Sequence, residues 1–313
     1  MSWQATALNL TLRLRMKRGA NRPLDVARAR AMAGTAPPEA LAVPAGWRVD
    51  PISKEGGLSF DEAMRDGPLL SSPPLVVYYL HGGGYFFGSP QTHRQVLIAL
   101  SKALDVPAYS LDYRLAPEHP FPAALDDALA GYRWLVARHP SARIIIAGDS
   151  AGGGLSLATA IAVRDGDRAL PRPSGLVLFS PWTDLAATGA SIEANKHSCV
   201  MFTPRSIREA AALYLANSDS RDPRVSPLYA DLKGLPPMAI YASRHELLLD
   251  DSTRLAERAR AAGVTVHCVI ERRMPHVWPI FVRLLPEARA AIADVARFVA
   301  SLDVPGHPSR ATT

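Results

Sequence analysis

The chain has 313 residues, 48% of them hydrophobic and 20% charged, which is typical of a globular protein with a sizeable core and excludes a disordered chain. A net charge of +6 could suggest nucleic-acid binding, but the arginines are interleaved with Ala and Leu and form no long basic run, so we expect no nucleic-acid partner. No apolar stretch is long enough to span a membrane.

The two cysteines, Cys199 and Cys268, form neither a CxxC motif nor a Cys/His metal-binding spacing. We therefore expect no disulfide framework, no metal site and no cofactor, and a cytoplasmic location. The N-terminal segment is not a signal peptide, because basic residues interrupt its apolar stretch at Arg13, Arg15 and Lys17. Together with Arg18 they could bind anionic lipid, but a cap helix with one solvated face is favoured, without stable membrane insertion.

Taken in chain order, residues 1–45 are predicted to be helical and then rich in Pro and Ala. From residue 46 onward, short β-rich runs alternate with helical patterns. Because no helix separates the first two strands, that edge of the sheet is predicted to be antiparallel. Strands are predicted at 47–50, 57–60, 75–80, 106–111, 143–148, 175–180, 238–242 and 264–270, with helices that include 121–138, 151–164, 252–262 and 286–301.

This alternation predicts an α/β fold, a mostly parallel eight-stranded doubly wound sheet flanked by helices. Residues 186–217 interrupt it with a further helical pattern at 203–218. Insertions at the carboxyl ends of strands are where a lid over a ligand site lies. We therefore divide the chain into the N-terminal part of a helical cap (1–45), the first part of the core (46–185), a cap insertion (186–217) and the second part of the core (218–313).

A G-x-S-x-G motif, "GDSAG", lies where the strand at 143–148 meets the following helix. The motif occurs once in the chain, and at such a junction it holds a serine on a sharp turn with helix amides directed at it. A plain Gly-rich turn is the simpler interpretation. The context favours Ser150 as a catalytic nucleophile, with the amide of Ala151 in an oxyanion hole.

A second glycine motif, "HGGG" at 81–84, directly follows the strand at 75–80. Glycines let backbone amides approach a ligand closely, and no Walker lysine or G-x-G-x-x-G pattern supports a phosphate loop instead. We assign Gly83 and Gly84 as oxyanion donors, with Gly82 setting the turn. His81 is expected to hold the loop. The candidates for contact with substrate are Tyr85, Phe86 and Trp182, while Phe87 could equally be packing.

A serine nucleophile needs a base, and in this topology the base follows the last strand. Among nine histidines, His276 lies between that strand and a helix. His267 lies inside the strand, and His307 is in a Pro/Gly-rich tail that we expect to be mobile. His276 is therefore the predicted base.

These motifs, together with "LDYRLAPEHPFPAALDD" (111–127) and "DPRVSPLYADLKGLPPMAIYAS" (222–243), resemble the bacterial hormone-sensitive-lipase-like esterases. The resemblance extends from about residue 75 to the end. It implies an α/β-hydrolase core with an N-terminal helical cap that hydrolyses carboxylic esters of short or medium acyl chain. The loop at 113–122 is predicted to support the site.

The acid of the predicted triad should follow the strand at 238–242, in the order serine, acid, histidine. Glu246 is nearest the strand end, and in the resembled family this position is usually Asp within a D-x-L-x-D pattern. Asp250 is the alternative acid, although Asp250 and Asp251 precede a helical pattern and are expected to cap that helix. His245 is expected to be a solvated neighbour.

Two other functions stay open at this point. The same triad could serve an amidase, thioesterase or deacetylase, and the fold also occurs in ligand-binding proteins that have lost catalysis. The presence of both Ser150 and His276 favours the enzyme. The expected partner is a small ester, and a homodimer could form through the last strand.

Overall fold

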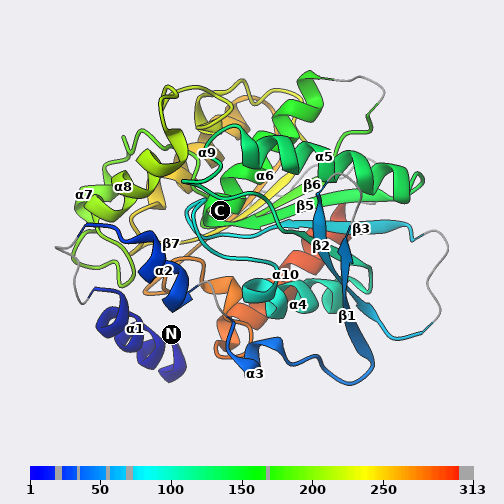
Figure 1. Ribbon diagram of the computed structural model, residues 1–313, viewed down its shortest axis with the longest axis horizontal. Coiled ribbons are helices and arrows are strands. Elements are labelled where there is room, and N and C mark those ends of the chain that lie inside the picture. Colours follow the sequence, from blue (N-terminus) through cyan, green and yellow to red (C-terminus); the bar gives the residue numbers. More distant parts are fainter. Residues whose placement is uncertain (18–22, 34–35, 54–56, 68–72, 167–169, 303–313) are drawn as a thin grey trace.

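The computed structural model describes residues 1–17, 23–33, 36–53, 57–67, 73–166 and 170–302 (Figure 1). Its centre is one eight-stranded sheet with the strand order β1-β2-β4-β3-β5-β6-β7-β8. From β4 to β8 all neighbouring strands are parallel, and β2 is antiparallel to both β1 and β4. The strands are β1 (Trp47–Ser53), β2 (Ser59–Arg65), β3 (Leu75–Leu80), β4 (Ala108–Leu111), β5 (Arg143–Asp149), β6 (Gly175–Phe179), β7 (Met238–Ser243) and β8 (Val266–Glu271).

The predicted fold class and the antiparallel edge are therefore confirmed. Central strands such as β3 are buried along their whole length, as expected of strands covered on both faces. The largest error in strand placement is β2, predicted at 57–60 and found at Ser59–Arg65. The charged residues Asp61 and Glu62 interrupt the apolar pattern by which a buried strand is predicted. Both are buried in the structure, where Arg94 donates to Asp61 and Tyr109 donates to Glu62.

Helices cover both faces of the sheet (Figure 1). On one face lie α5 (Ala123–Arg138), α6 (Ser150–Asp165) and α9 (Leu249–Ala261), and on the other lie α4 (Arg94–Leu104) and α10 (Pro286–Ser301). The remaining helices are α1 (Trp3–Met16), α2 (Val26–Ala33), α3 (Pro38–Leu41), α7 (Ser191–Ala194) and α8 (Pro204–Leu215), with 3₁₀ turns η1 (Gln91–His93), η2 (Pro227–Tyr229) and η3 (Trp278–Ile280).

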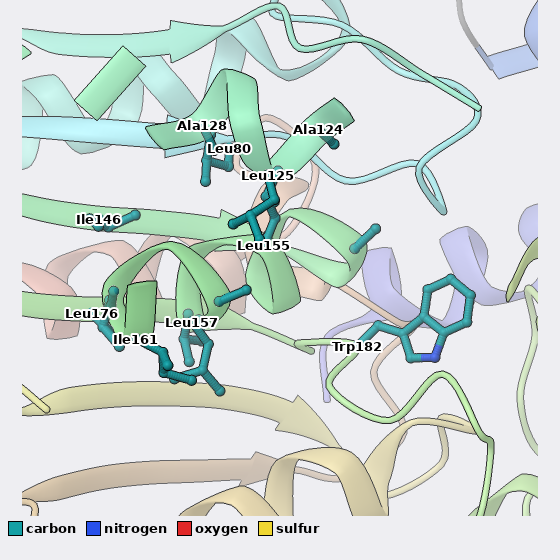
Figure 2. Packing of buried hydrophobic residues seen from close by; sticks show 14 of the residues in the cluster. Leu80, Ala124, Leu125, Ala128, Ile146, Leu155, Leu157, Ile161, Leu176 and Trp182 are labelled. Atoms are coloured by element: carbon teal, nitrogen blue, oxygen red, sulfur yellow. The ribbon is translucent and has the colours of Figure 1, made fainter. Parts of the chain in front are cut away.

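The two faces of the sheet carry separate hydrophobic clusters, one under α5, α6 and α9 and one under α4 and α10. Figure 2 shows side chains of α6, among them Leu155 and Ile161, beside Ile146 and Leu176 of the sheet. Burial of such side chains contributes roughly 1.5–3 kcal/mol each. The helix that begins at Ser150 is thereby fixed against the centre of the sheet.

Segments 1–45 and 186–217 lie beside each other in the described part of the chain. The Leu24 amide donates to Glu209 of α8 at 2.9 Å, and the ammonium of Lys17 donates to the carbonyl of Lys196 at 2.7 Å. Arg13 donates to the carbonyl of His197. In Figure 1, α1 and α2 lie on the same side of the molecule as α7 and α8. None of the described helices is long and apolar enough to cross a membrane.

Candidate active site

Ser150 occupies a strained turn between β5 and α6. Its φ is +51°, a left-handed conformation that costs energy for any residue with a side chain, and the residue is 9% exposed. The flanking glycines allow close packing at this turn. A Cβ on Gly152 would lie 2.0 Å from the Leu80 carbonyl oxygen, and one on Gly148 would lie 2.4 Å from that of Gly152. The two glycines of the motif therefore stand where any side chain would collide with the neighbouring backbone.

His276 lies between Ser150 and Glu246. Its Nε2 is 2.9 Å from the Ser150 hydroxyl oxygen, and its Nδ1 is 2.5 Å from Glu246 Oε2. A carboxylate only accepts, so Nδ1 carries the proton in this arrangement and Nε2 is free to accept from the serine. His276 is 2% exposed and Glu246 is 1% exposed, which removes water from between them.

The loops around His276 and Glu246 are fixed by two serines at strand ends. Ser180 Oγ, directly after β6, accepts from the amide of Val277 at 3.0 Å. The last residue of β7, Ser243, donates its hydroxyl to the Met274 carbonyl at 2.7 Å and its amide to Glu246 Oε1 at 2.9 Å. The positions of the acid and the base are therefore set by neighbouring parallel strands.

The glycines of HGGG take the conformations that the loop requires. Gly83 and Gly84 have φ values of +124° and +59°, and a Cβ on Gly83 would lie 1.9 Å from the Phe87 carbonyl oxygen. Both are partly exposed. The Gly82 amide donates to Asp149 Oδ1 at 2.9 Å, so it is already occupied and suits the turn more than a donor role. Ala151 lies in the first turn of α6, where amides have no partner within the helix.

Asp149, the residue before Ser150, connects the nucleophile turn to the HGGG loop. Its Oδ1 accepts from Tyr79 at 2.7 Å and from Gly82, and lies 3.4 Å from Nε2 of His93. Burial acts to raise the pKa of Asp149, but His93 and the other donors outweigh it and lower that pKa. Burial acts to lower the pKa of His93, and attraction to Asp149 outweighs it and raises that pKa. The two form a buried ion pair when His93 is protonated.

We expect Asp149→Asn to lower the free energy of unfolding by about 2 kcal/mol at pH 6, because the amide can still accept from Tyr79 and Gly82 but leaves His93 without its counter-ion. The raised pKa of His93 means that the pair stabilises the fold fully below pH 6.5, and that this contribution is lost as pH rises through the folded-state pKa. Urea unfolding at pH 6 and pH 9 measures both effects. An equal loss in the free energy of unfolding at the two pH values would contradict the ion pair. The matched control is His93→Gln, which removes the other partner of the pair.

His81 holds the HGGG loop from inside the protein. It is fully buried, and its ring stacks on Tyr113 with centroids 4.2 Å apart. Burial and the neighbouring His93 lower its pKa to about 3, so it is neutral. Tyr113 also donates its hydroxyl to the His81 carbonyl at 2.6 Å, and the Ala116 amide donates to the Tyr85 carbonyl at 2.8 Å. The loop at 113–122 therefore contacts the HGGG loop directly, and its support of the site stays a prediction.

The three predicted pocket aromatics are well buried, with Tyr85 and Trp182 each 2% exposed and Phe86 5% exposed. Tyr85 stacks on Tyr214 of α8 with centroids 3.7 Å apart. Figure 2 shows Trp182 beyond the ends of the central strands, and its amide donates to the Ser150 carbonyl at 2.8 Å. Their contact with substrate stays a prediction. Phe87 is partly exposed.

The expectation that Asp250 and Asp251 cap α9 is wrong. The helix begins at Leu249, so both lie inside its first turn, and their side chains bind the loop after β6 instead. Asp250 Oδ2 accepts from the Ser191 amide at 2.9 Å. Asp251 Oδ2 accepts from the amides of Thr183 and Asp184 at 2.7 and 2.8 Å. The sequence showed acids near a helix start, but not the loop that they bind, which lies 59 to 68 residues upstream.

Asp251 gives the fold a pH dependence. Burial, followed by the neighbouring Asp184, raises its pKa to about 8. Between pH 4 and 8 the folded protein holds a proton that the unfolded chain releases, so stability falls as pH rises, by at most about 1.4 kcal/mol per pH unit. We therefore expect Asp251→Asn to gain stability relative to the unmodified protein between pH 5 and pH 8. Urea unfolding across that range measures it, and a difference independent of pH would contradict it.

The other histidines that were considered have structural contacts. His267 Nε2 lies 2.6 Å from Asp294 of α10, on an exposed part of β8. His245 is partly buried, not fully solvated as expected, because its Nδ1 accepts from the Arg273 amide at 3.0 Å. His307 and Arg18 lie outside the described residues. In the described part of the chain, no three His, Cys, Asp or Glu side chains are grouped so that they could hold a metal ion.

Sequence reasoning missed several residues around the site, among them His93, Asp149, Ser243 and Phe202. Asp149 occupies the second position of the G-x-S-x-G motif, where the motif specifies no residue type, so the pattern assigned it no role. Ser243 lies three positions before Glu246, where a strand end could have suggested it. Phe202, whose ring meets His276 edge-on with centroids 5.3 Å apart, comes from the 186–217 segment and has no local signal.

Comparisons with known proteins agree with the fold described above. A family model described as the alpha/beta hydrolase fold matches residues 77–280. An acetyl-hydrolase of Streptomyces hygroscopicus is 43% identical over 72% of this chain and 75% of its own length. The crystal structure of EstE5 soaked with p-nitrophenyl butyrate superimposes with a TM-score of 0.86, at 36% identity over 96% of this chain and 99% of that one. An esterase of the bacterial hormone-sensitive lipase family superimposes with a TM-score of 0.84, at 36% identity and the same coverage.

Proposed function

The chain belongs to the α/β-hydrolase family, in its bacterial hormone-sensitive-lipase-like branch, and on that premise we propose that it hydrolyses carboxylic esters of short to medium acyl chain. The observation that carries the proposal is the aligned series of Ser150, His276 and Glu246, with contacts of 2.9 and 2.5 Å. Similarity to an acetyl-hydrolase, and to a structure soaked with a butyrate ester, supports a short acyl group.

In the proposed mechanism, Ser150 Oγ attacks the ester carbonyl while His276 Nε2 accepts the serine proton. Glu246 holds the imidazole through Nδ1 and stabilises the imidazolium that forms. The amides of Gly83, Gly84 and Ala151 donate to the oxyanion of the tetrahedral intermediate, which then expels the alcohol with a proton from His276. Water attacks the resulting acyl-enzyme by the same route and frees the acid.

The arrangement of donors suits this reaction because it needs little reorganisation. The HGGG loop is fixed to the nucleophile turn through Asp149, and α2 fixes it from the outside. Arg30 of α2 donates to the Phe86 carbonyl at 2.8 Å and to the Ala116 carbonyl at 2.9 Å. A donor removed from an oxyanion hole typically costs a factor of 10² to 10³ in kcat.

A panel of p-nitrophenyl esters with acyl chains of two to twelve carbons tests the function. We expect kcat/KM to be highest among the short and medium esters and to fall for the longest chain, because the side chains beside Ser150 are closely packed. A matched p-nitroanilide and a thioester distinguish an amidase or thioesterase on the same residues. No turnover of any ester, with binding retained, would indicate a ligand-binding protein instead.

A further inference from the structure

Helix α1 is apolar on two opposite faces. Its inner face contacts the body of the protein through Ala5, which is fully buried, and Leu8, which packs on the cluster under α4 and α10. On the opposite face are Trp3, Leu10 and Leu14, which are 76%, 60% and 47% exposed. Spacings of seven and four residues place these three on one side of an α-helix, and we call them the α1 stripe.

An exposed stripe of this kind differs from the solvated cap-helix face that the sequence favoured. A surface helix normally turns charged or polar residues to water, and a helix that is apolar all round is normally covered on all sides. Contiguous exposed apolar surface marks an interaction site, whereas single exposed residues carry no such meaning. The outer face of α1 is therefore a candidate interaction surface.

The charge around the α1 stripe indicates what covers it. Residues 1–17 contain no Asp or Glu, and the exposed Arg13 and Arg15 are adjacent to Leu14 on either side. Arg273, whose carbonyl accepts from Asn9 at 2.7 Å, is exposed beside the helix, and so is Lys196, whose carbonyl is bound by Lys17 and whose ammonium pairs with Glu193 at 3.6 Å. An apolar strip with tryptophan at one end and basic residues on its flanks matches an anionic lipid surface.

We propose that α1 is a peripheral membrane-docking helix, which lays the α1 stripe into the surface of an anionic bilayer while its inner face stays on the protein. Trp3, Leu10 and Leu14 enter the boundary of the acyl chains, and Arg13 and Arg15 contact the head groups. A second copy is the weaker occupant, because it would bring another basic helix against this one. The docking goes beyond ester hydrolysis and does not depend on it.

Docking at α1 would place the membrane near the segments that carry the base and the acid. Asn9 binds the carbonyl of Arg273, three residues before His276. Arg13 binds the carbonyl of His197, in the loop where Asn195 donates to the Glu246 carbonyl at 2.8 Å. In Figure 1, α1 lies at the outer edge of the molecule, and the side chains of its α1 stripe are exposed among the described residues.

Vesicle flotation tests the proposal with the full chain and two lipid compositions, phosphatidylcholine alone and phosphatidylcholine mixed with phosphatidylglycerol. We expect binding to the anionic vesicles alone, weakened by salt. The double variant Leu10→Ser/Leu14→Ser should bind at least about tenfold more weakly, and Arg15→Gln about fivefold more weakly. Leu284→Ser is the matched control, since Leu284 is 54% exposed and lies outside α1.

Thermal unfolding and gel filtration of every variant accompany the flotation. Failure of the unmodified chain to bind anionic vesicles would overturn the proposal, and so would equal binding to both compositions or equal losses in the double variant and Leu284→Ser. A dimer that the double variant dissociates would assign the stripe to a second copy and overturn it too. If the double variant unfolds, the proposal is tested by the vesicle binding of Arg15→Gln and by the salt dependence of binding by the unmodified chain. Because flotation needs no ester, its outcome is independent of the proposed hydrolysis.

Discussion

Replacing Ser150 with Ala is expected to lower kcat for p-nitrophenyl butyrate hydrolysis by about 10⁴-fold or more, without a matching change in stability. The serine oxygen is the nucleophile of the proposed mechanism, and no other hydroxyl is placed on His276 Nε2 within the described residues. What remains after its removal is catalysis by the oxyanion donors and by substrate binding alone. Alanine also carries a Cβ, so the strained φ of +51° at this position stays and stability should change little.

His276→Ala serves as the companion variant for this measurement. Residues that act as one unit give losses that do not add, so the double variant Ser150→Ala/His276→Ala should be about as slow as either single variant. Initial rates with each purified protein, with the unfolding midpoint as a folding check, are sufficient. Turnover in Ser150→Ala within tenfold of the unmodified protein would show that another residue is the nucleophile.

Glu246→Gln is expected to lower kcat by about 10³- to 10⁴-fold at pH 7, with little change in KM. The glutamine side chain keeps the shape but can present a donor to His276 Nδ1, which favours the ring tautomer that cannot accept from Ser150. It also removes the negative charge that stabilises the imidazolium. Glu246→Asp should recover part of the activity, because the carboxylate returns on a side chain one methylene shorter.

The matched control is Asp250→Asn, the alternative acid from the same stretch of sequence. The Asp250 carboxylate binds the Ser191 amide, and an asparagine oxygen can accept that same hydrogen bond. We therefore expect Asp250→Asn to retain activity within about fivefold, as for a change outside the reacting groups. A larger loss in Asp250→Asn than in Glu246→Gln would transfer the acid role to Asp250.

The fold and the motif residues were accessible from sequence because their signals are local. Buried parallel strands are continuous apolar runs, and the glycines on either side of Ser150 and at 82–84 stand where steric demands leave no alternative. His276 was found by its position after the last strand. The relevant constraint in each case acts within a few residues of the motif.

The errors came from contacts between distant segments. His93 and Asp149 pair across 56 residues of sequence, and Phe202 reaches His276 from the 186–217 segment. The aspartates at the start of α9 were predicted to cap that helix because they precede a helical pattern. They bind instead a distant loop, residues 183–191, which the local sequence does not reveal. Neither composition nor periodicity carries such information, since burial of a polar group depends on which chain segment supplies its partner.

Several of the hydrogen bonds that attach the N-terminal helices to the rest of the chain run to carbonyl groups. Arg13, Lys17 and Arg30 each donate to the main chain of a distant loop, at His197, Lys196, Phe86 and Ala116. Every residue type presents the same carbonyl, so the side chains of those loops can be exchanged without loss of the attachment. Sequence drift, or directed evolution, can therefore change the side chains of these loops while these hydrogen bonds to the N-terminal helices are kept.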